Sequence, residues 1–172
     1  MTKETITPSI YVACLAAYNN GILHGAWIDA CQDADGIRNE IVSMLAASPI
    51  AGVEEYAIHD YEGFEGASVS EYAGIDEVAE LAAFIAEHGR LGAELVAYFG
   101  DLDDARTALE AHYVGAYRSV ADFAEELTED TTEIPDSLRF YIDYERMARD
   151  LVVNDVLVIE LSFEEVHVFW QH

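Results

Sequence analysis

Residues 75–89 read IDEVAELAAFIAEHG and carry the most regular apolar pattern of the chain. At about 100° per residue, the apolar positions share one helix face: Ile75, Val78, Leu81, Ala82 and Ile85. Acidic positions occupy the opposite face: Asp76, Glu80 and Glu87, with Glu77 beside them. Because glycine commonly ends helices, Gly89 is expected to close this one. The pattern predicts a helix over Ile75–His88 with one buried and one acidic face.

The sequence around this helix divides into three parts. Residues 62–104 form a glycine-punctuated, helical middle part, with a second short helix expected at Gly92–Phe99. In the first part, residues 1–61, the Asn-Gly pair of Tyr18–Gly21 indicates a hairpin turn. Ser48-Pro49 is expected to end a helix. The elements predicted there are strands at Ser9–Leu15, Gly25–Ala30 and Glu55–Tyr61, and a helix at Gly36–Ala47.

The last part, residues 105–172, mixes both element types. Helical periodicity is found at Leu102–Ala111, Val120–Thr128 and Ser137–Leu151. Strand-like segments are found at Tyr113–Arg118, Val156–Leu161 and Val166–Trp170. The predicted fold is α+β: an elongated chain of three small domains, 1–61, 62–104 and 105–172, with small antiparallel sheets and helices at both ends and a helical middle.

Charge is the most unusual property of the chain. It has 34 acidic residues against 8 basic ones, for a net charge of −26, yet 52% of its residues are hydrophobic. Such composition permits a folded core, although like charges repel and oppose compaction. The acidity can serve solubility, as in proteins of high-salt habitats, or bind cations, or form a surface for a basic partner.

The segment following Ser119 repeats the arrangement of the first helix. Ser119 to Asp122 fits a helix-capping signature, and the apolar side is expected to be Val120, Phe123, Ala124 and Leu127. The outer stripe and its continuation contain no lysine or arginine: Asp122, Glu125, Glu126, Glu129, Asp130, Glu133 and Asp136. On the first helix, Asp76 and Glu80 are about 6 Å apart along the axis, comparable to the rise of about 3.4 Å between phosphates of one DNA strand.

Arginines are concentrated where a helix would let them pair with acids. Four pairs have the four-residue spacing that favours contact on a helix: Arg106–Glu110, Arg139–Asp143, Glu145–Arg149 and Arg146–Asp150. Elsewhere the acids stand alone in the sequence. This selective placement of arginines favours an acidic surface with a binding function over acidity that serves only solubility.

Several segments resemble the ArdA antirestriction protein family, and together they span almost the whole chain. Near the start they are Ile10–Ala13, Tyr18–Gly21 and His24–Asp29. In the last part they are Tyr117–Ser119, Asp122–Leu127, Ile134-Pro135, Leu138, Tyr141–Glu145 and Ala148–Leu151. The middle part matches mainly in its acidic character.

The resemblance implies an elongated, curved, non-catalytic protein of three domains that dimerises through its C-terminal domain. It implies a protein encoded on mobile elements that imitates B-form DNA. Its partner would be a type I restriction–modification enzyme, whose DNA-binding groove in the methyltransferase core it would occupy. Cleavage, and often methylation, would be blocked. A dimer would carry twice −26, or −52, the charge of roughly 26 base pairs.

On this interpretation, acidic side chains of the last two parts stand in for phosphates and accept hydrogen bonds from lysine and arginine. The predicted phosphate-mimicking residues are Glu62, Glu65, Glu71, Asp76, Glu77, Glu80, Glu87, Asp101, Asp103, Asp104, Asp122, Glu125, Glu126, Glu129, Asp130, Glu133 and Asp136. Single substitutions among them should have small effects because the charge is spread.

Other site chemistry has weaker support in the sequence. The six histidines are scattered without a nucleophile motif, and no glycine-rich phosphate loop is present, so we expect no catalytic residues and no cofactor. Asp33–Gly36 lacks the remaining ligands of a calcium loop and is interpreted as a turn leading into a helix. Cys14 and Cys31 are expected to be buried thiols in adjacent strands, not metal ligands. No metal site is predicted.

The remaining expectations concern environment and alternatives. Without a signal-peptide pattern or an apolar run of about 20 residues, the chain is expected to be cytoplasmic, and its charge argues against binding to nucleic acid or membranes. Its aromatic residues are expected to lie mostly in the core, some facing a second subunit: Tyr113, Tyr117, Phe140, Tyr141, Tyr144, Phe169 and Trp170. Two other functions stay open: an acidic globular protein whose charge serves solubility, or an inhibitor of a different basic DNA-binding protein.

Overall fold

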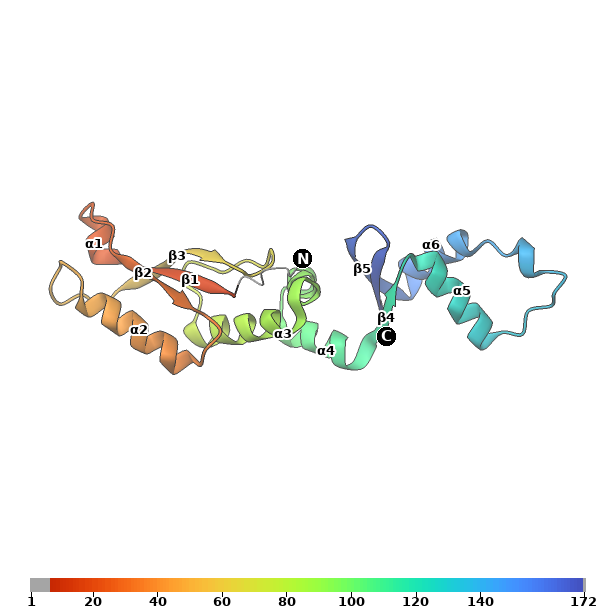
Figure 1. Ribbon diagram of the computed structural model, residues 1–172, viewed down its shortest axis with the longest axis horizontal. Helices are drawn as coiled ribbons and strands as arrows, with labels where there is room; N and C mark the ends of the chain where they lie inside the picture. The colour runs from red at the N-terminus through yellow and green to blue at the C-terminus, as the bar shows by residue number, and fades with distance from the viewer. Residues whose placement is uncertain (1–6, 172) are drawn as a thin grey trace, which may run out of the picture. The chain divides into compact units, whose positions relative to one another are not determined.

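A computed structural model describes residues 7–171 of the protein (Figure 1). The chain divides into two compact units, with the boundary after Gly100; we call them unit 1 and unit 2. Each contains helices and one small three-stranded antiparallel sheet. The predicted α+β class is therefore confirmed.

Unit 1 is built on a sheet of strand order β2-β1-β3, formed by β1 (Ser9–Cys14), β2 (Gly25–Asp29) and β3 (Tyr56–Glu62). β1 pairs antiparallel with both neighbours, as the predicted hairpin requires. The turn predicted at Tyr18–Gly21 is present, with the Gly21 amide donating to the Tyr18 carbonyl at 3.0 Å, and a short helix that was not predicted, α1 (Leu15–Asn19), leads into it. The side-chain amide of Asn20 donates to the Ala16 carbonyl at 2.7 Å and closes that helical turn.

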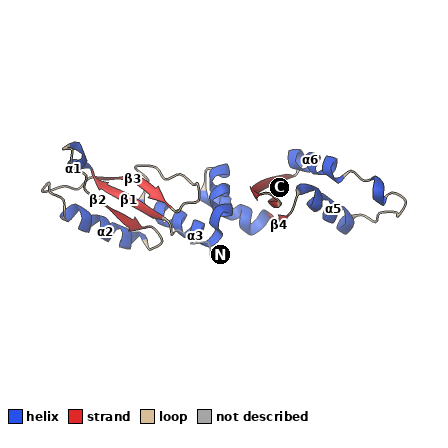
Figure 2. Ribbon diagram, turned by 45° about the horizontal axis from the view of Figure 1, so that its top comes forward, coloured by secondary structure: helices blue, strands red, loops and turns tan. Residues whose placement is uncertain are grey.

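Two helices, α2 (Ala34–Ala46) and α3 (Ile75–Phe99), run along one face of this sheet (Figure 2). α2 begins two residues before the predicted start at Gly36, because the Asp33 carboxylate caps the helix by accepting a hydrogen bond from the Gly36 amide at 2.8 Å. One hydrophobic core unites strands and helices: Ile10, Val12, Ile28, Ile37, Ile41, Ile58, Ile75, Val78, Ala82 and Ile85. Because residues of the first and middle parts share this core, the division into three domains is not confirmed and stays a prediction.

α3 is interrupted at Gly89, where the predicted helix Ile75–His88 ends and a second helical segment reaches Phe99. The backbone of Gly89 has φ 62° and ψ −145°, outside the helical range. This region is accessible almost only to glycine. Gly89 therefore turns the second segment away from the first.

Replacing Gly89 with alanine should destabilise the protein by about 1–3 kcal/mol. An added Cβ atom would meet nothing within 4 Å, so the cost arises from the backbone conformation alone. Urea denaturation followed by circular dichroism measures it. Gly74→Ala is the matched control, because Gly74 has an ordinary φ of −64° and its added Cβ would make only ordinary contacts. Equal midpoints for the two variants would contradict the assignment of strain to Gly89.

Unit 2 begins with α4 (Leu102–Thr107), which continues as a π-helical turn, η1 (Ala108–His112), in place of the single α-helix expected over Leu102–Ala111. The remaining elements are β4 (Tyr113–Tyr117), α5 (Val120–Thr131), the 3-10 turn η2 (Arg139–Tyr141), α6 (Tyr144–Asn154), β5 (Val156–Ser162) and β6 (Glu165–Trp170). The strands form a sheet of order β4-β6-β5. α5 and α6 pack together, and Phe123 of α5 joins Val156 and Val168 in the core.

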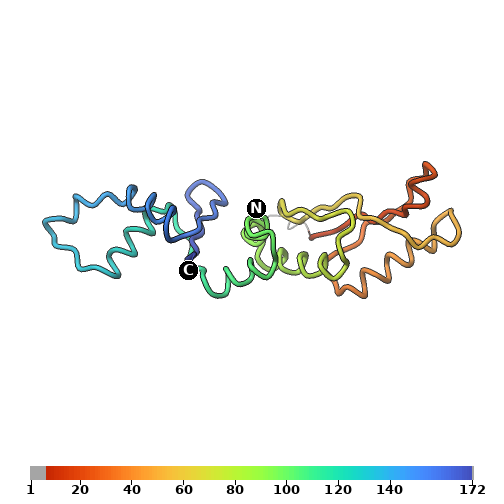
Figure 3. Tube along the Cα trace, turned by 180° about the vertical axis from the view of Figure 1, so that it is seen from behind, coloured from red at the N-terminus to blue at the C-terminus, as the bar shows by residue number. Residues whose placement is uncertain are grey.

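The helix predicted over Ser137–Leu151 is wrong in its first half. α6 starts only at Tyr144, because the Asp143 carboxylate caps it by accepting a hydrogen bond from the Arg146 amide at 3.0 Å. Residues 132–143 instead form a loop with one 3-10 turn, at the end of unit 2 away from its sheet (Figure 3).

Candidate partner-binding surface

Each of the 17 acidic residues predicted from the sequence is exposed in the structure. α3 presents its acids outward because Ile75, Val78 and Ala82 face the core of unit 1. α5 does the same because Phe123 and Ala124 are buried. Each unit thus carries exposed acids of its own among the candidate residues.

Eight of these residues have neither an ion pair nor a side-chain hydrogen bond within residues 7–171. We call them the free acids: Glu65, Glu77, Glu80, Asp104, Asp122, Glu125, Asp130 and Glu133. Three lie in unit 1 and five in unit 2. Exposed carboxylates without an internal counter-ion keep their full charge available to an external cation. They are the best candidates for direct contact with a basic partner.

Six of the predicted residues form ion pairs, and two of these pairs overturn expectations from the sequence. Asp76 pairs with Arg38 of α2 at 2.7 Å, although no base lies near it on its own helix. Glu129 pairs with Arg139 at 3.8 Å, although the outer stripe of α5 was expected to lack a nearby base. Both pairs depend on tertiary contact, which helical spacing cannot reveal. Asp103 pairs with Arg106 at 3.5 Å and Asp136 with Arg139 at 3.7 Å. Glu71 and Glu87 each lie 3.7 Å from a histidine, His59 and His88, and these contacts are ion pairs only when the imidazole is protonated.

Arg38 illustrates how such pairing alters the surface. It contacts Asp76 at 2.7 Å and Asp35 at 3.3 Å. The hydrogen bonds and charges of these carboxylates, Asp76 first, raise the pKa of Arg38 above its ordinary value. Asp76 is therefore partly neutralised within unit 1 and less available to a partner than Glu77 or Glu80.

The last three predicted acids have structural hydrogen bonds. Glu62 accepts from the Ser9 hydroxyl at 3.4 Å, and Asp101 caps α4 by accepting from the Asp103 amide at 2.7 Å. Glu126 accepts a short hydrogen bond from the Tyr117 hydroxyl. Burial and this hydrogen bond raise the pKa of Tyr117 to about 12. Glu126 thus ties α5 to β4 and has a role in the fold.

The arginine pairs expected at four-residue spacing are largely wrong. Arg139 precedes α6 and contacts Glu129 and Asp136 instead of Asp143. Arg106 pairs with Asp103 and not with Glu110. Within the described residues, no ion pair within 4 Å joins the α6 pairs Glu145–Arg149 or Arg146–Asp150.

Two aromatic residues expected in the core are almost fully exposed. Phe140 is 93% exposed and Tyr141 is 85% exposed, both in the 3-10 turn of the 132–143 loop. Their apolar character predicted burial, because the segment was interpreted as part of a helix. The signals against that helix were Pro135, which favours a turn, and Asp143, a preferred cap residue.

Polar groups outside the acidic surface have structural partners. The buried His167 lies 2.7 Å from the Tyr113 hydroxyl and 3.1 Å from the Glu165 carboxylate. Burial and the charge of Glu165 raise the pKa of Tyr113. Cys14 is buried in β1, whereas Cys31 is half-buried and follows β2, not within a strand as expected; both thiols are free. The pKa of the Cys31 thiol is raised, mainly by burial and to a smaller extent by the negative charge of Asp29.

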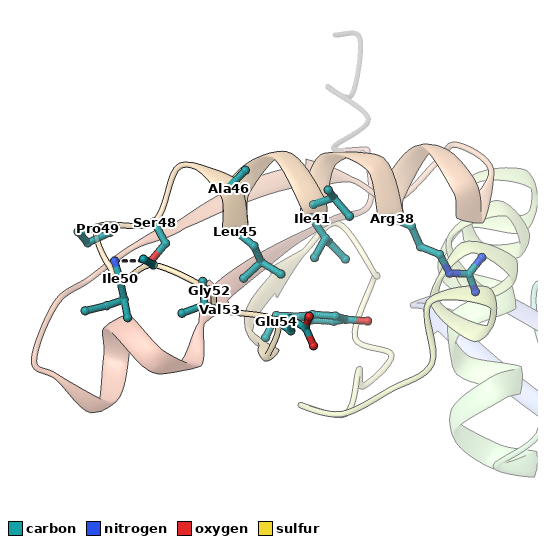
Figure 4. A pocket seen from close by; sticks show the side chains of 13 residues that line it. Arg38, Ile41, Leu45, Ala46, Ser48, Pro49, Ile50, Gly52, Val53 and Glu54 are labelled. Atoms are coloured by element: carbon teal, nitrogen blue, oxygen red, sulfur yellow. Dashed lines mark hydrogen bonds between the residues drawn. The ribbon is translucent and has the colours of Figure 1, made fainter.

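A pocket of about 790 Å³ lies between α2 and the 47–55 loop of unit 1 (Figure 4). Its walls are mostly aliphatic, including Ile41, Leu45 and Val53, with Arg38 at one end. The Ser48 hydroxyl accepts a hydrogen bond from the Ile50 amide at 3.2 Å and shapes the loop. None of the 17 predicted acids lines the pocket, although its Arg38 is the ion-pair partner of one of them, Asp76.

Two further observations concern metals and membranes. In the described part of the chain, no group of three or more His, Cys, Asp and Glu side chains is arranged to hold a metal ion. Among residues 7–171, no helix is both long and apolar enough to cross a bilayer.

Comparison with known proteins assigns the chain to a family. A search of curated proteins found no match. The family model described as antirestriction protein (ArdA) matches residues 10–165, which is most of the 172-residue chain. The protein therefore belongs to the ArdA antirestriction protein family.

Proposed function

We propose that the protein inhibits type I restriction–modification enzymes by occupying, in place of DNA, the DNA-binding groove of the methyltransferase core. The observation that carries this proposal is the set of eight free acids on the surfaces of both units. Duplex DNA presents a dense array of phosphates to lysine and arginine side chains. Carboxylates without internal counter-ions offer the same kind of acceptor.

The spacing of the free acids supports the proposal. Glu77 and Glu80 on α3, and Asp122 and Glu125 on α5, are each three residues apart. Three residues of helix rise about 4.5 Å, close to the advance of about 3.4 Å between phosphates of one strand. Each helix therefore presents charges at intervals similar to those of a DNA backbone.

In this proposal the protein acts in the cytoplasm as a homodimer, which would double its charge and lengthen the imitated duplex. It blocks cleavage by keeping DNA out of the groove, and blocks methylation wherever the same groove serves that reaction. No chemical step on the inhibitor is required, which fits a surface of carboxylates.

A competition assay tests the proposed function. A labelled duplex carrying the recognition site is bound to a type I methyltransferase core, and the purified protein is added at low and moderate salt. We expect displacement at near-stoichiometric protein, weakening as salt rises because ion pairs and released counter-ions drive the binding. Failure to displace the duplex at large excess, with enzymes of several type I families, would contradict the proposal.

A further inference from the structure

The loop between α5 and α6 exposes a cluster of large apolar side chains. Phe140 is 93% exposed, Tyr141 85% and Leu138 54%; we call these three residues the aromatic tip. Burying an aromatic ring away from water is favourable, so rings exposed to solvent do not gain this stabilisation within the protein itself. Clustered exposure of this kind is typical of binding sites, and aromatic residues dominate the binding energy of many interfaces.

The aromatic tip has a defined conformation. The Leu138 amide donates to the Pro135 carbonyl at 2.9 Å, and the Tyr141 amide donates to the Leu138 carbonyl at 3.0 Å. Between them, the Arg139 guanidinium lies 3.8 Å from Glu129 of α5 and 3.7 Å from Asp136. These contacts link the turn to α5, while the rings of Phe140 and Tyr141 are exposed to solvent. A preformed anchor loses less conformational entropy when it binds.

The charge around the aromatic tip indicates what kind of partner it fits. Residues 129–143 contain one base, Arg139, and five acids: Glu129, Asp130, Glu133, Asp136 and Asp143. Two copies of the chain meeting tip to tip would bring these acids together, and like charges repel. A partner with an apolar recess inside a basic rim is complementary to both parts of the surface.

We infer that the aromatic tip enters the recess in which the methyltransferase holds a base extruded from the duplex. This inference rests on the proposed function. Enzymes that modify bases rotate the target out of the stack into a pocket lined by aromatic and apolar groups. That pocket opens from the groove that binds the phosphates of DNA. An aromatic ring surrounded by carboxylates is therefore complementary to the pocket and to the basic groove around it. The protein then imitates a base as well as a phosphate backbone.

The first test compares aromatic substitutions in the competition assay. Phe140→Ser combined with Tyr141→Ser should weaken displacement about 10-fold or more. The salt dependence should keep its slope, because no charge is removed. Phe163→Ser is the matched control: Phe163 is 89% exposed in the β5–β6 turn of the same unit, and its loss should have little effect. The urea midpoints of all variants should equal that of the parent, because the altered side chains are exposed.

The second test locates the aromatic tip on the enzyme. Phe140→p-benzoylphenylalanine places a photo-cross-linker in the tip, and Phe163→p-benzoylphenylalanine is its control. We expect cross-links from position 140 to the walls of the target-base pocket. Cross-links only to a second copy of this chain, or only to other surfaces of the enzyme, would overturn the inference.

The two tests separate failure of the inference from failure of the proposed function. If the parent protein displaces DNA and the double serine variant does so equally well, the aromatic tip has no anchoring role, and phosphate imitation alone is retained. If the parent protein displaces no DNA, the proposed function fails, and the inference fails with it.

Discussion

Replacing Glu77, Glu80, Glu125 and Glu133 with glutamine should weaken displacement of DNA from the methyltransferase core by about 30-fold or more. The four residues belong to the free acids, so their loss disturbs no ion pair or side-chain hydrogen bond of the described fold. Glutamine keeps a hydrogen-bond acceptor but loses the charge, and an exposed ion pair contributes up to about 1 kcal/mol, of which we take about 0.5–1 kcal/mol for each carboxylate. Four such losses amount to about 2–4 kcal/mol, and each 1.4 kcal/mol corresponds to about tenfold in affinity.

The salt dependence provides an independent measurement of the same effect. Each carboxylate that contacts a cation of the partner contributes to the slope of log affinity against log salt concentration. The quadruple variant should therefore show a shallower slope than the parent. Its stability toward urea should stay equal or rise, because removing like charges relieves repulsion within the fold.

The matched control replaces four other exposed glutamates: Glu54, Glu55, Glu110 and Glu160, each by glutamine. Both variants lose four negative charges through the same chemical change, so they differ only in position. We expect the control to keep most of the inhibitory activity. Equal losses in both variants would assign inhibition to total charge, and full activity in both would contradict phosphate imitation by the free acids.

Local patterns in the sequence predicted most elements of the fold. The three strands predicted in unit 1 each agree with β1, β2 and β3 to within one residue at either end. The capping role of Ser119 was also correct, since its hydroxyl accepts a hydrogen bond from the Asp122 amide at 3.1 Å. These features depend on neighbours in the chain, which is why a pattern can reveal them.

Features that depend on distant residues could not be predicted in this way. Asp76 and Arg38 are 38 residues apart and meet because α2 and α3 share one core. The start of α6 is a different case, since the periodicity of Ser137–Leu151 suited a longer helix. Capping by Asp143 and the turn after Pro135 competed with that periodicity and prevailed. Because α6 is shorter than predicted, Phe140 and Tyr141 lie outside the helix and are exposed.

The acidic stripe of α5 depends on a single large core residue, Phe123. Its ring is 2% exposed and lies between Tyr117 of β4, with ring centroids 5.3 Å apart, and Trp170 of β6, at 5.8 Å. Phe123→Ala should destabilise unit 2 by about 3–5 kcal/mol, because it removes buried apolar surface and leaves a cavity. This cost is a large fraction of the stability of about 5–15 kcal/mol that is usual for a folded domain.

Tryptophan fluorescence in urea can follow this loss in unit 2. The two tryptophans lie in different units, so a Trp27→Phe background leaves Trp170, which contacts the ring of Phe123, as the reporter. The Phe123→Ala variant should unfold at a clearly lower urea concentration than the same background with Phe163→Ala. That control removes an equally large aromatic ring from a position that is 89% exposed. Equal midpoints would show that Phe123 contributes no more to stability than an exposed ring does.

Phe123→Ala also tests whether the proposed inhibition requires the folded arrangement of the carboxylates or only their total charge. Phe123→Ala leaves the net charge at −26 and retains every free acid. Asp122 and Glu125, which flank Phe123 on α5, keep their spacing only while this helix is packed on the sheet of unit 2. At urea concentrations where this variant is unfolded and the Phe163→Ala control is folded, the control should still displace DNA and the Phe123→Ala variant should not. If the unfolded chain still displaced DNA, an acidic polymer would be sufficient for inhibition. Carboxylates held at the intervals of duplex phosphates would then not be required.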